Sequence, residues 1–329
     1  MDRSRPRSGV LTGRLLIAIA AALFLVAAAA APPLKAMRWL APGVRPLVLA
    51  SRPAECLATP ADPDDAYRVE LGRAAFRTPL LLGGQAARAG IACETCHQNG
   101  RSNPNFDFPG LSGAPGTADV TSSLFSSHRG DDVDNPRPIP DLGGPREKLK
   151  VSQGRQGRAL ETFVDGLIVQ EFDGHEPPPA VLDGLAAYVR AMGPAACPAQ
   201  AREPVRLAGA VSDARRAARA ALAAIAHDDF DAAAVMVEAV RSQLGAINER
   251  YAAPGLADER RALAAADQDL ARALAAVRLH DRAAADDLHA WLEKSDAWSA
   301  QLARTERKSL YDPIRLARLA VTARARASN

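Results

Sequence analysis

The feature that most constrains this chain is the pentapeptide Cys-Glu-Thr-Cys-His at residues 93–97. Two thiols separated by two residues can both reach the vinyl groups of one porphyrin, and a histidine directly after them can bind the iron. Cys93 and Cys96 would form the thioethers, and His97 would be the proximal iron ligand with an acceptor on its other ring nitrogen. A thioredoxin-like redox pair would need a βαβ context, and a zinc site would need a second pair of Cys or His ligands. The sequence offers neither, so it predicts one covalently bound haem c.

The residues around this pentapeptide predict a small helical domain with a long loop. The spacing of apolar residues predicts helices at residues 64–76, 159–170 and 180–192. Between 99 and 157 the chain is dense in Gly, Pro, Asn, Asp and Ser, which is typical of irregular structure. Such a long loop is unusual in a compact domain, but a haem would supply a core that loops can wrap. We therefore expect a monohaem cytochrome c domain at residues 64–197.

The N-terminus has the pattern of an export signal. Four arginines precede an apolar run of 17 residues at 15–31, and two prolines end the run. This arrangement is typical of a secretory signal peptide, but the run also approaches the length of a membrane-spanning helix. Residues 1–34 are therefore expected to be either a cleaved signal peptide or an N-terminal membrane anchor. In both cases the arginines keep the N-terminus in the cytoplasm, so the remaining chain is expected in the periplasm.

Two further cysteines, Cys56 and Cys197, bracket the predicted haem domain. In an oxidising compartment they form a plausible disulfide that ties the ends of the domain together, and the alternative is two unrelated thiols. Residues 35–63 and 198–204 are predicted to be linkers, because they are rich in proline and alanine and have no sustained periodicity.

The second half of the chain predicts a helical bundle. Four segments carry apolar residues at heptad-like spacing, and short turns separate them, so an antiparallel four-helix bundle is expected at residues 205–303. Trp291 and Trp298 lie one heptad apart and are expected in its core, while a docking or dimerisation role is the alternative. A basic segment at 304–329 follows, with a short helix near Pro313. The expected fold is mainly α, a cytochrome c-like haem domain followed by an antiparallel helical bundle.

The charge balance argues against nucleic acid as a partner. The formal net charge is +3, and lysine and arginine are spread along the chain rather than clustered in a stripe. The expected partners are redox proteins, together with the membrane if the N-terminal segment is retained.

One stretch of the chain carries a family resemblance. The sequence LGRAAFRTPLLLGGQAARAGIACETCHQNGR resembles the haem-binding start of bacterial dihaem cytochrome c peroxidases and the related methylamine-utilisation enzymes. FVDGLIVQEFDGHEPPPAVLDGLAAYVRAM is similar to the closing helices of their C-terminal haem domain. The resemblance covers residues 64–195 and implies that Cys93, Cys96 and His97 attach and ligate the haem. Those enzymes carry two CxxCH sites and this chain carries one, so their peroxidase chemistry does not follow from the resemblance.

The sixth iron position separates the possible functions. The candidate donors are His128, Met192 and His175. Each also has a simpler interpretation: His128 as a surface-loop residue, Met192 as a core residue and His175 as part of an exposed turn. A bound donor saturates the iron and favours one-electron transfer, which is the leading expectation. An open position would allow peroxidase-like catalysis, with His128, Glu171 or Asp173 as the acid–base group. A haem-based sensor or assembly subunit is a third alternative, and the sequence assigns no catalytic residue. Three histidines of the bundle are expected to be structural or exposed: His227, His280 and His289.

Overall fold

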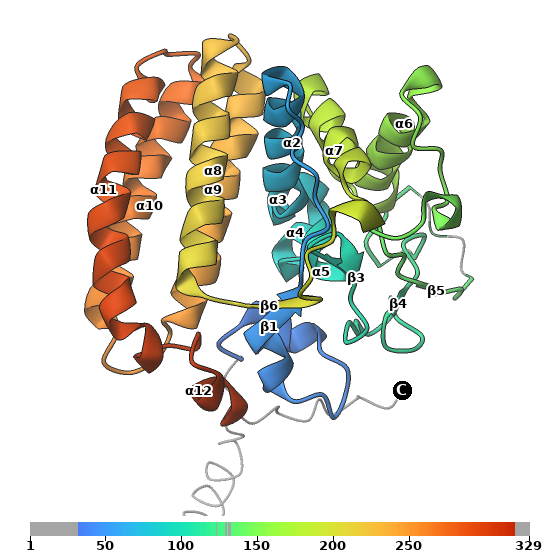
Figure 1. Cartoon of the computed structure of the whole chain (residues 1–329), viewed down its shortest axis with the longest axis horizontal. Helices are drawn as coiled ribbons and strands as arrows, with labels where there is room; N and C mark the ends of the chain where they lie inside the picture. The colour runs from blue at the N-terminus through green and yellow to red at the C-terminus, as the bar shows by residue number, and fades with distance from the viewer. Residues whose placement is uncertain (1–31, 123, 129, 131–132, 320–329) are drawn as a thin grey trace, which may run out of the picture. The chain divides into compact units, whose positions relative to one another are not determined.

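The computed structural model describes residues 32–122, 124–128, 130 and 133–319. From Pro33 onward the chain forms one compact unit, and its described residues are mainly helical, as predicted (Figure 1). The predicted signal peptide or anchor at 1–34 lies outside the described residues, apart from residues 32–34. Within the described ranges, every helix is too short or too polar to cross a bilayer.

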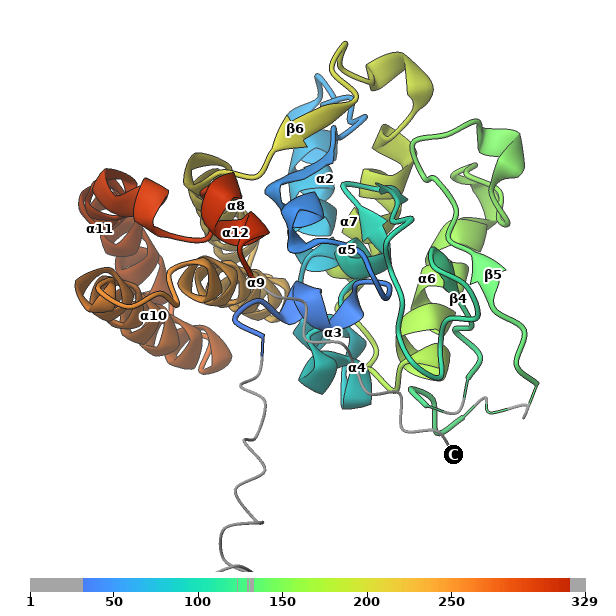
Figure 2. The same ribbon diagram turned by 90° about the horizontal axis from the view of Figure 1, so that it is seen from below.

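The predicted four-helix bundle is present. It consists of α8 (Leu207–Ala226), α9 (Phe230–Arg250), α10 (Ala257–Arg278) and α11 (Ala284–Thr305). Each helix packs on the next, and α11 packs on α8, so the ring of four is closed, as Figure 2 shows end-on. Short turns join the helices, which therefore run antiparallel.

Both tryptophans predicted for the bundle core are buried. The indole N–H of Trp291 donates to the backbone carbonyl of Ala266 at 3.1 Å, so its polar group is satisfied inside the core. The ring of Trp298 lies 6.0 Å from that of Trp291. Both side chains contribute to the bundle core.

Two helices form the scaffold of the other half. Helix α2 (Pro63–Phe76) packs along α7 (Pro179–Ala191), close to the boundaries predicted for both. The crossing is made by Gly72 and Gly184, and a Cβ added at Gly72 would lie 1.9 Å from the carbonyl oxygen of Gly184. Only glycine permits this approach of two backbones.

Short elements and loops alternate between α2 and α7, and the described residues of 99–157 are mostly loop, as predicted. The helix predicted at 159–170 is α6 (Ala159–Gly166) followed by the π-helical turn η5 (Leu167–Glu171). The other helical elements are α3 (Pro79–Leu82), α4 (Gly84–Ala89), α5 (Cys93–Cys96), η3 (Arg146–Lys148) and η4 (Gln156–Arg158). The antiparallel strand pairs are β2 (His97–Gln98) with β3 (Arg101–Ser102), and β4 (Thr117–Ala118) with β5 (Arg137–Pro138).

The two predicted linkers are wrong, because both segments are packed. Strand β1 (Ser51–Pro53) from the first pairs antiparallel with β6 (Arg202–Pro204) from the second. The first segment also holds the turns η1 (Lys35–Trp39) and η2 (Pro46–Ala50), and the second begins after Cys197, which follows η6 (Pro194–Ala196). Apolar residues at irregular spacing give no periodic signal, yet they pack in a small separate core made of Leu34, Met37, Leu40, Leu49, Leu310 and Leu316.

The end of the described chain packs on this core. The 3-10 turn η7 (Glu306–Lys308) leads to α12 (Pro313–Ala317), which is the short helix predicted near Pro313. Helix α12 contacts η2, so the basic C-terminal segment predicted at 304–329 begins as folded structure, and residues 320–329 lie outside the described residues.

The two halves, predicted as separate domains, share one core. Helix α2 contacts α8 and α9, and their apolar side chains belong to a single continuous cluster. Arg73 on α2 donates to Asp213 on α8 at 2.6 Å, and Arg216 on α8 pairs with Glu70 on α2. Helix α2 therefore covers one side of α8 outside the bundle core, which heptad spacing within the bundle could not indicate.

The predicted disulfide between Cys56 and Cys197 is present. Close to it, Leu57 and Met192 form an isolated antiparallel bridge. The disulfide therefore joins the segment before α2 to the segment after α7.

Candidate functional site

The pentapeptide at residues 93–97, called here the CETCH turn, is a single helical turn followed by a strand. Gly90 ends α4 in the left-handed region with φ of +72°, which only glycine adopts readily, and redirects the chain. The hydroxyl of Thr95 accepts a hydrogen bond from the backbone N–H of Ala92 at 3.0 Å and caps α5. Both cysteines therefore lie on one turn, and His97 follows directly as the first residue of β2.

His97 is held in one tautomer. Its Nδ1 lies 3.0 Å from the backbone carbonyl oxygen of Pro140, and because a carbonyl can only accept, Nδ1 must carry the proton. The Nε2 atom is then the unprotonated nitrogen. Burial lowers the pKa of His97 to about 4, so the ring is neutral at pH 7. A neutral imidazole with a free Nε2 is the form that binds a metal ion.

Cys93 and Cys96 are both reduced thiols in an apolar environment. Each side chain is half-buried and packs against the hydrophobic core. Burial raises the pKa of each thiol to about 12, so both are protonated at neutral pH. Two accessible thiols and one imidazole on adjacent residues are the donor set that a covalently attached haem requires.

Behind the CETCH turn lies a buried charge network that the sequence analysis missed. Glu94 accepts a hydrogen bond from the backbone N–H of Asn99 at 3.0 Å and lies 3.8 Å from Arg77. Arg77 donates to Asn99 and to Glu55, at 2.9 Å and 3.0 Å. Burial raises the pKa of Glu94, and the positive charge of Arg77 opposes that shift.

This network continues to the bundle. Arg73 donates to both oxygens of Glu55, at 3.1 Å and 3.0 Å, and to Asp213 on α8 at 2.6 Å. Tyr188 on α7 donates its hydroxyl to Glu55 at 2.6 Å. The available sequence signal was the i, i+4 spacing of Arg73, in α2, and Arg77, directly after it, since buried arginines require acidic partners. The network connects the CETCH turn rigidly to α2, α7 and α8.

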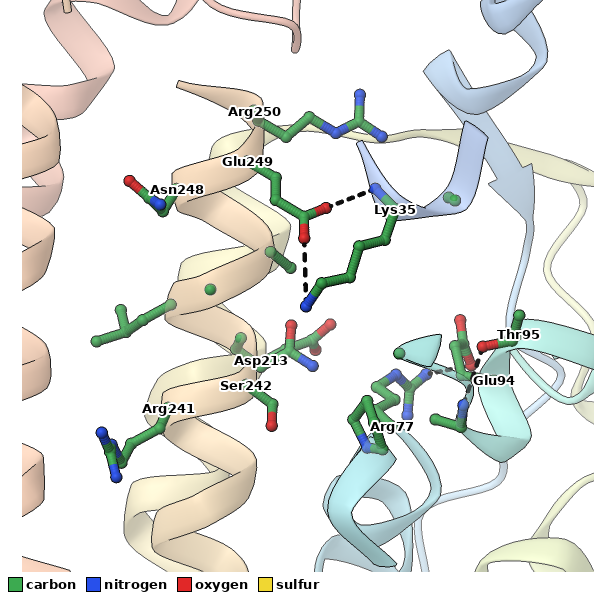
Figure 3. A pocket seen from close by; sticks show the side chains of 18 of the residues that line it. Lys35, Arg77, Glu94, Thr95, Asp213, Arg241, Ser242, Asn248, Glu249 and Arg250 are labelled. Atoms are coloured by element: carbon green, nitrogen blue, oxygen red, sulfur yellow. Dashed lines mark hydrogen bonds and ion pairs between the residues drawn. The ribbon is translucent and has the colours of Figure 1, made fainter. Parts of the chain in front are cut away.

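A cleft of about 1190 Å³ opens beside this network, and Arg77, Glu94 and Asp213 are among the residues that line it (Figure 3). Glu94 and Thr95 line it on one side, and residues of α9 such as Ser242 line it on the other. An ion pair between Lys35 and Glu249, at 3.5 Å, lies at its edge. Cys93, Cys96 and His97 are not among the residues that line this cleft.

Met192 occupies a core position. Its side chain is fully buried, and its sulfur packs so closely on Gly100 that a Cβ added there would lie 1.9 Å away. Gly100 belongs to the turn between β2 and β3, three residues after His97. Met192 therefore supports the hairpin that presents His97, as its core interpretation predicted.

The other candidate donors lie near the protein surface. His128 is exposed, and its Nε2 lies 3.8 Å from the carboxylate of Asp173. Asp173 also accepts hydrogen bonds from the backbone and hydroxyl of Ser127, at 2.8 Å and 2.9 Å. His175 is exposed, and Glu171 is buried. The structure therefore brings together His128 and Asp173 from the predicted set.

The bundle histidines occupy structural or exposed positions. The ring of His227 stacks on Tyr67 at 5.3 Å, and that of His280 stacks on Phe230 at 5.0 Å. His289 is exposed on α11. These positions agree with their predicted structural roles.

Comparison with known proteins adds no assignment to this site. The chain has no significant match to any protein-family model, curated protein or solved structure. Among the residues that the structure describes, no group of three or more His, Cys, Asp or Glu side chains is arranged to hold a metal ion.

Proposed function

We propose that Cys93, Cys96 and His97 bind one haem c, and that the protein transfers single electrons between redox partner proteins in the periplasm. The observation that carries this proposal is the contact between His97 Nδ1 and the Pro140 carbonyl, directly after a turn with two free thiols. The haem iron, when bound, supplies a one-electron couple between its ferric and ferrous states.

The residues of the chain have separate tasks in this proposal. The thiols of Cys93 and Cys96 attach the porphyrin, and His97 offers Nε2 to the iron because Pro140 occupies Nδ1. The hydrogen bond to Pro140 orients the ring and increases its basicity. The half-buried thiols pack against apolar side chains, which suits an apolar porphyrin ring.

The position of Met192 favours a second candidate function. A sulfur that packs on Gly100 is engaged in the core, and His128 and His175 are exposed. An iron without a sixth protein ligand would bind peroxide or another small ligand. Peroxidase-like catalysis is therefore the alternative, with the His128–Asp173 pair as its candidate acid–base group.

The test is to express the full chain in a host that attaches haem to exported proteins, then measure its mass and optical spectrum. We expect one covalent haem, which the double variant Cys93→Ala, Cys96→Ala loses. His175→Ala, a change at an exposed histidine, is the matched control and should retain it. A wild-type chain without covalent haem would refute the proposal.

The same preparation separates the two functions. A low-spin spectrum that does not change with carbon monoxide or peroxide indicates a six-coordinate iron and supports electron transfer. A high-spin spectrum that shifts with either ligand indicates an open position and supports the peroxidase-like alternative.

A further inference from the structure

The turn that carries the acceptor of His97 is held by one ion pair. Arg101 on β3 donates through Nε and Nη2 to the two carboxylate oxygens of Asp141, at 2.6 Å and 2.7 Å. Asp141 directly follows Pro140, whose carbonyl oxygen contacts His97. A two-pronged Arg–carboxylate contact fixes geometry as well as charge. The position of the Pro140 carbonyl is therefore coupled to Arg101.

Two further hydrogen bonds hold the same turn. Asp141 Oδ1 accepts from the backbone N–H of Gly143 at 3.0 Å, and the N–H of Leu142 donates to the carbonyl of Gly100 at 2.9 Å. Gly100 lies in the turn between β2, which carries His97, and β3. The bond from Leu142 therefore joins the turn around Pro140 to the hairpin that carries His97.

The disulfide contacts Arg101, the basic residue of this ion pair. Arg101 Nη1 lies 2.9 Å from the sulfur of Cys56 and 3.8 Å from that of Cys197. A Cβ added at Gly143 would lie 3.2 Å from the Cβ of Cys56, which leaves little room for the turn to move. A continuous series of contacts thus runs from the disulfide through Arg101 and Asp141 to the ring of His97.

The charge of Asp141 also acts on His97. Asp141 directly follows Pro140, whose carbonyl oxygen contacts the His97 ring, so its negative charge lies on the turn that contacts this ring. The side chains of Arg101 and Asp141 are 28% and 34% exposed, so water screens the pair only in part.

We propose that Arg101 and Asp141 are positioning residues for His97, and that their ion pair sets the reduction potential of the iron that His97 binds. This inference rests on the proposed haem attachment. The carboxylate favours the ferric state, which carries one more positive charge, and the held carbonyl makes the imidazole a stronger donor to that state. Both effects lower the reduction potential.

Three variants test the inference on the haem-loaded full chain. Asp141→Asn removes the charge and weakens the hold on the turn, so we expect a higher reduction potential. Arg101→Lys keeps the charge but lacks the planar fork, so we expect a smaller rise caused by positioning alone. Asp183→Asn removes one partner of the exposed Arg158–Asp183 pair, and this matched control should leave the potential unchanged.

A second readout reports on positioning directly. In both site variants the Nδ1 proton of His97 should exchange with solvent faster than in the wild type, as measured by NMR of the reduced protein, and in Asp183→Asn it should not. The inference is overturned if Asp141→Asn shifts the potential no more than Asp183→Asn, or if the exchange rate does not change. A wild-type chain without covalent haem overturns the proposed function and this inference together, whereas a loaded chain with unshifted variants overturns the inference alone.

Discussion

Replacing Gly72 with alanine tests the closest contact between α2 and α7. A Cβ at this position would lie 1.9 Å from the carbonyl oxygen and 2.3 Å from the carbonyl carbon of Gly184, and 2.7 Å from the nitrogen of Leu185. Side-chain carbons essentially never approach other atoms within 3.0 Å. All three obstacles are backbone atoms, so no side chain can rotate away, and the helices must separate by about 1 Å.

The magnitude follows from two opposing effects. Overpacking a well-packed interface costs about 1–3 kcal/mol, and a backbone obstacle places this site near the upper end. Alanine in place of glycine within a helix raises the free energy of unfolding by about 1 kcal/mol through its higher helix propensity. We therefore expect Gly72→Ala to lower the free energy of unfolding by about 2 kcal/mol, and to lower Tm by about 4 °C.

The matched control is Gly245→Ala in α9, where an added Cβ meets no atom within 4 Å. This variant should gain about 0.5–1 kcal/mol of stability from propensity alone. Thermal and urea unfolding, followed by circular dichroism, would compare both variants with the wild type. If Gly72→Ala proves as stable as Gly245→Ala, the backbone contact between α2 and α7 is not as the structure describes it.

Two further predictions concern the disulfide and the buried charges. The Cys56–Cys197 disulfide closes a loop of 141 residues, so replacing both cysteines with serine increases the entropy of the unfolded chain. The free energy of unfolding should fall by up to about 5 kcal/mol, measured as a lower urea midpoint. An unchanged midpoint would contradict this prediction. Burial acts to raise the pKa of Glu55, but Arg77 and Arg73 hold it at about 2, below its usual 4.5. Because the folded state binds this proton less readily than the unfolded state, the stability that Glu55 contributes is complete above about pH 4.5 and is lost as the pH falls toward 2. Glu55→Gln should therefore weaken the fall in stability between about pH 4.5 and pH 2. An unaltered dependence of stability on pH would show that another group controls it.

Elements with strong periodicity could be predicted from the sequence, and so could the disulfide. The helices α8 to α11 each carry a regular apolar face over about five or six turns, which leaves little choice of structure. Cys56 and Cys197 were the two cysteines left after the CETCH turn was assigned, so only one pairing remained.

Contacts between distant segments could not be predicted. Strands β1 and β6 are three residues long and each contains a proline, so their composition resembles that of a linker. The pair of Arg73 with Asp213 joins positions 140 residues apart, and a single sequence does not indicate which buried charges meet. For the same reason, the sequence could not indicate that the two halves share one core.

The pentapeptide was enough to predict candidate ligands, which stay a prediction, but the residues that support them could not be predicted. The pentapeptide identified Cys93, Cys96 and His97 and required an acceptor for His97, but Pro140 is 43 residues away in an irregular loop. Loop residues give no periodic signal, so neither this acceptor nor the Arg101–Asp141 pair could be named from spacing.

The two cysteine pairs of this chain have opposite redox states within one fold. Cys56 and Cys197 are bridged, whereas Cys93 and Cys96 are thiols. Disulfide exchange requires a thiolate, and burial raises the pKa of both thiols to about 12, which strongly disfavours the thiolate at pH 7. In the unfolded chain the same thiols would have a pKa of about 8.5 and would attack a disulfide far more readily. Folding around the CETCH turn therefore protects the bridge from exchange with these two thiols for as long as they are free.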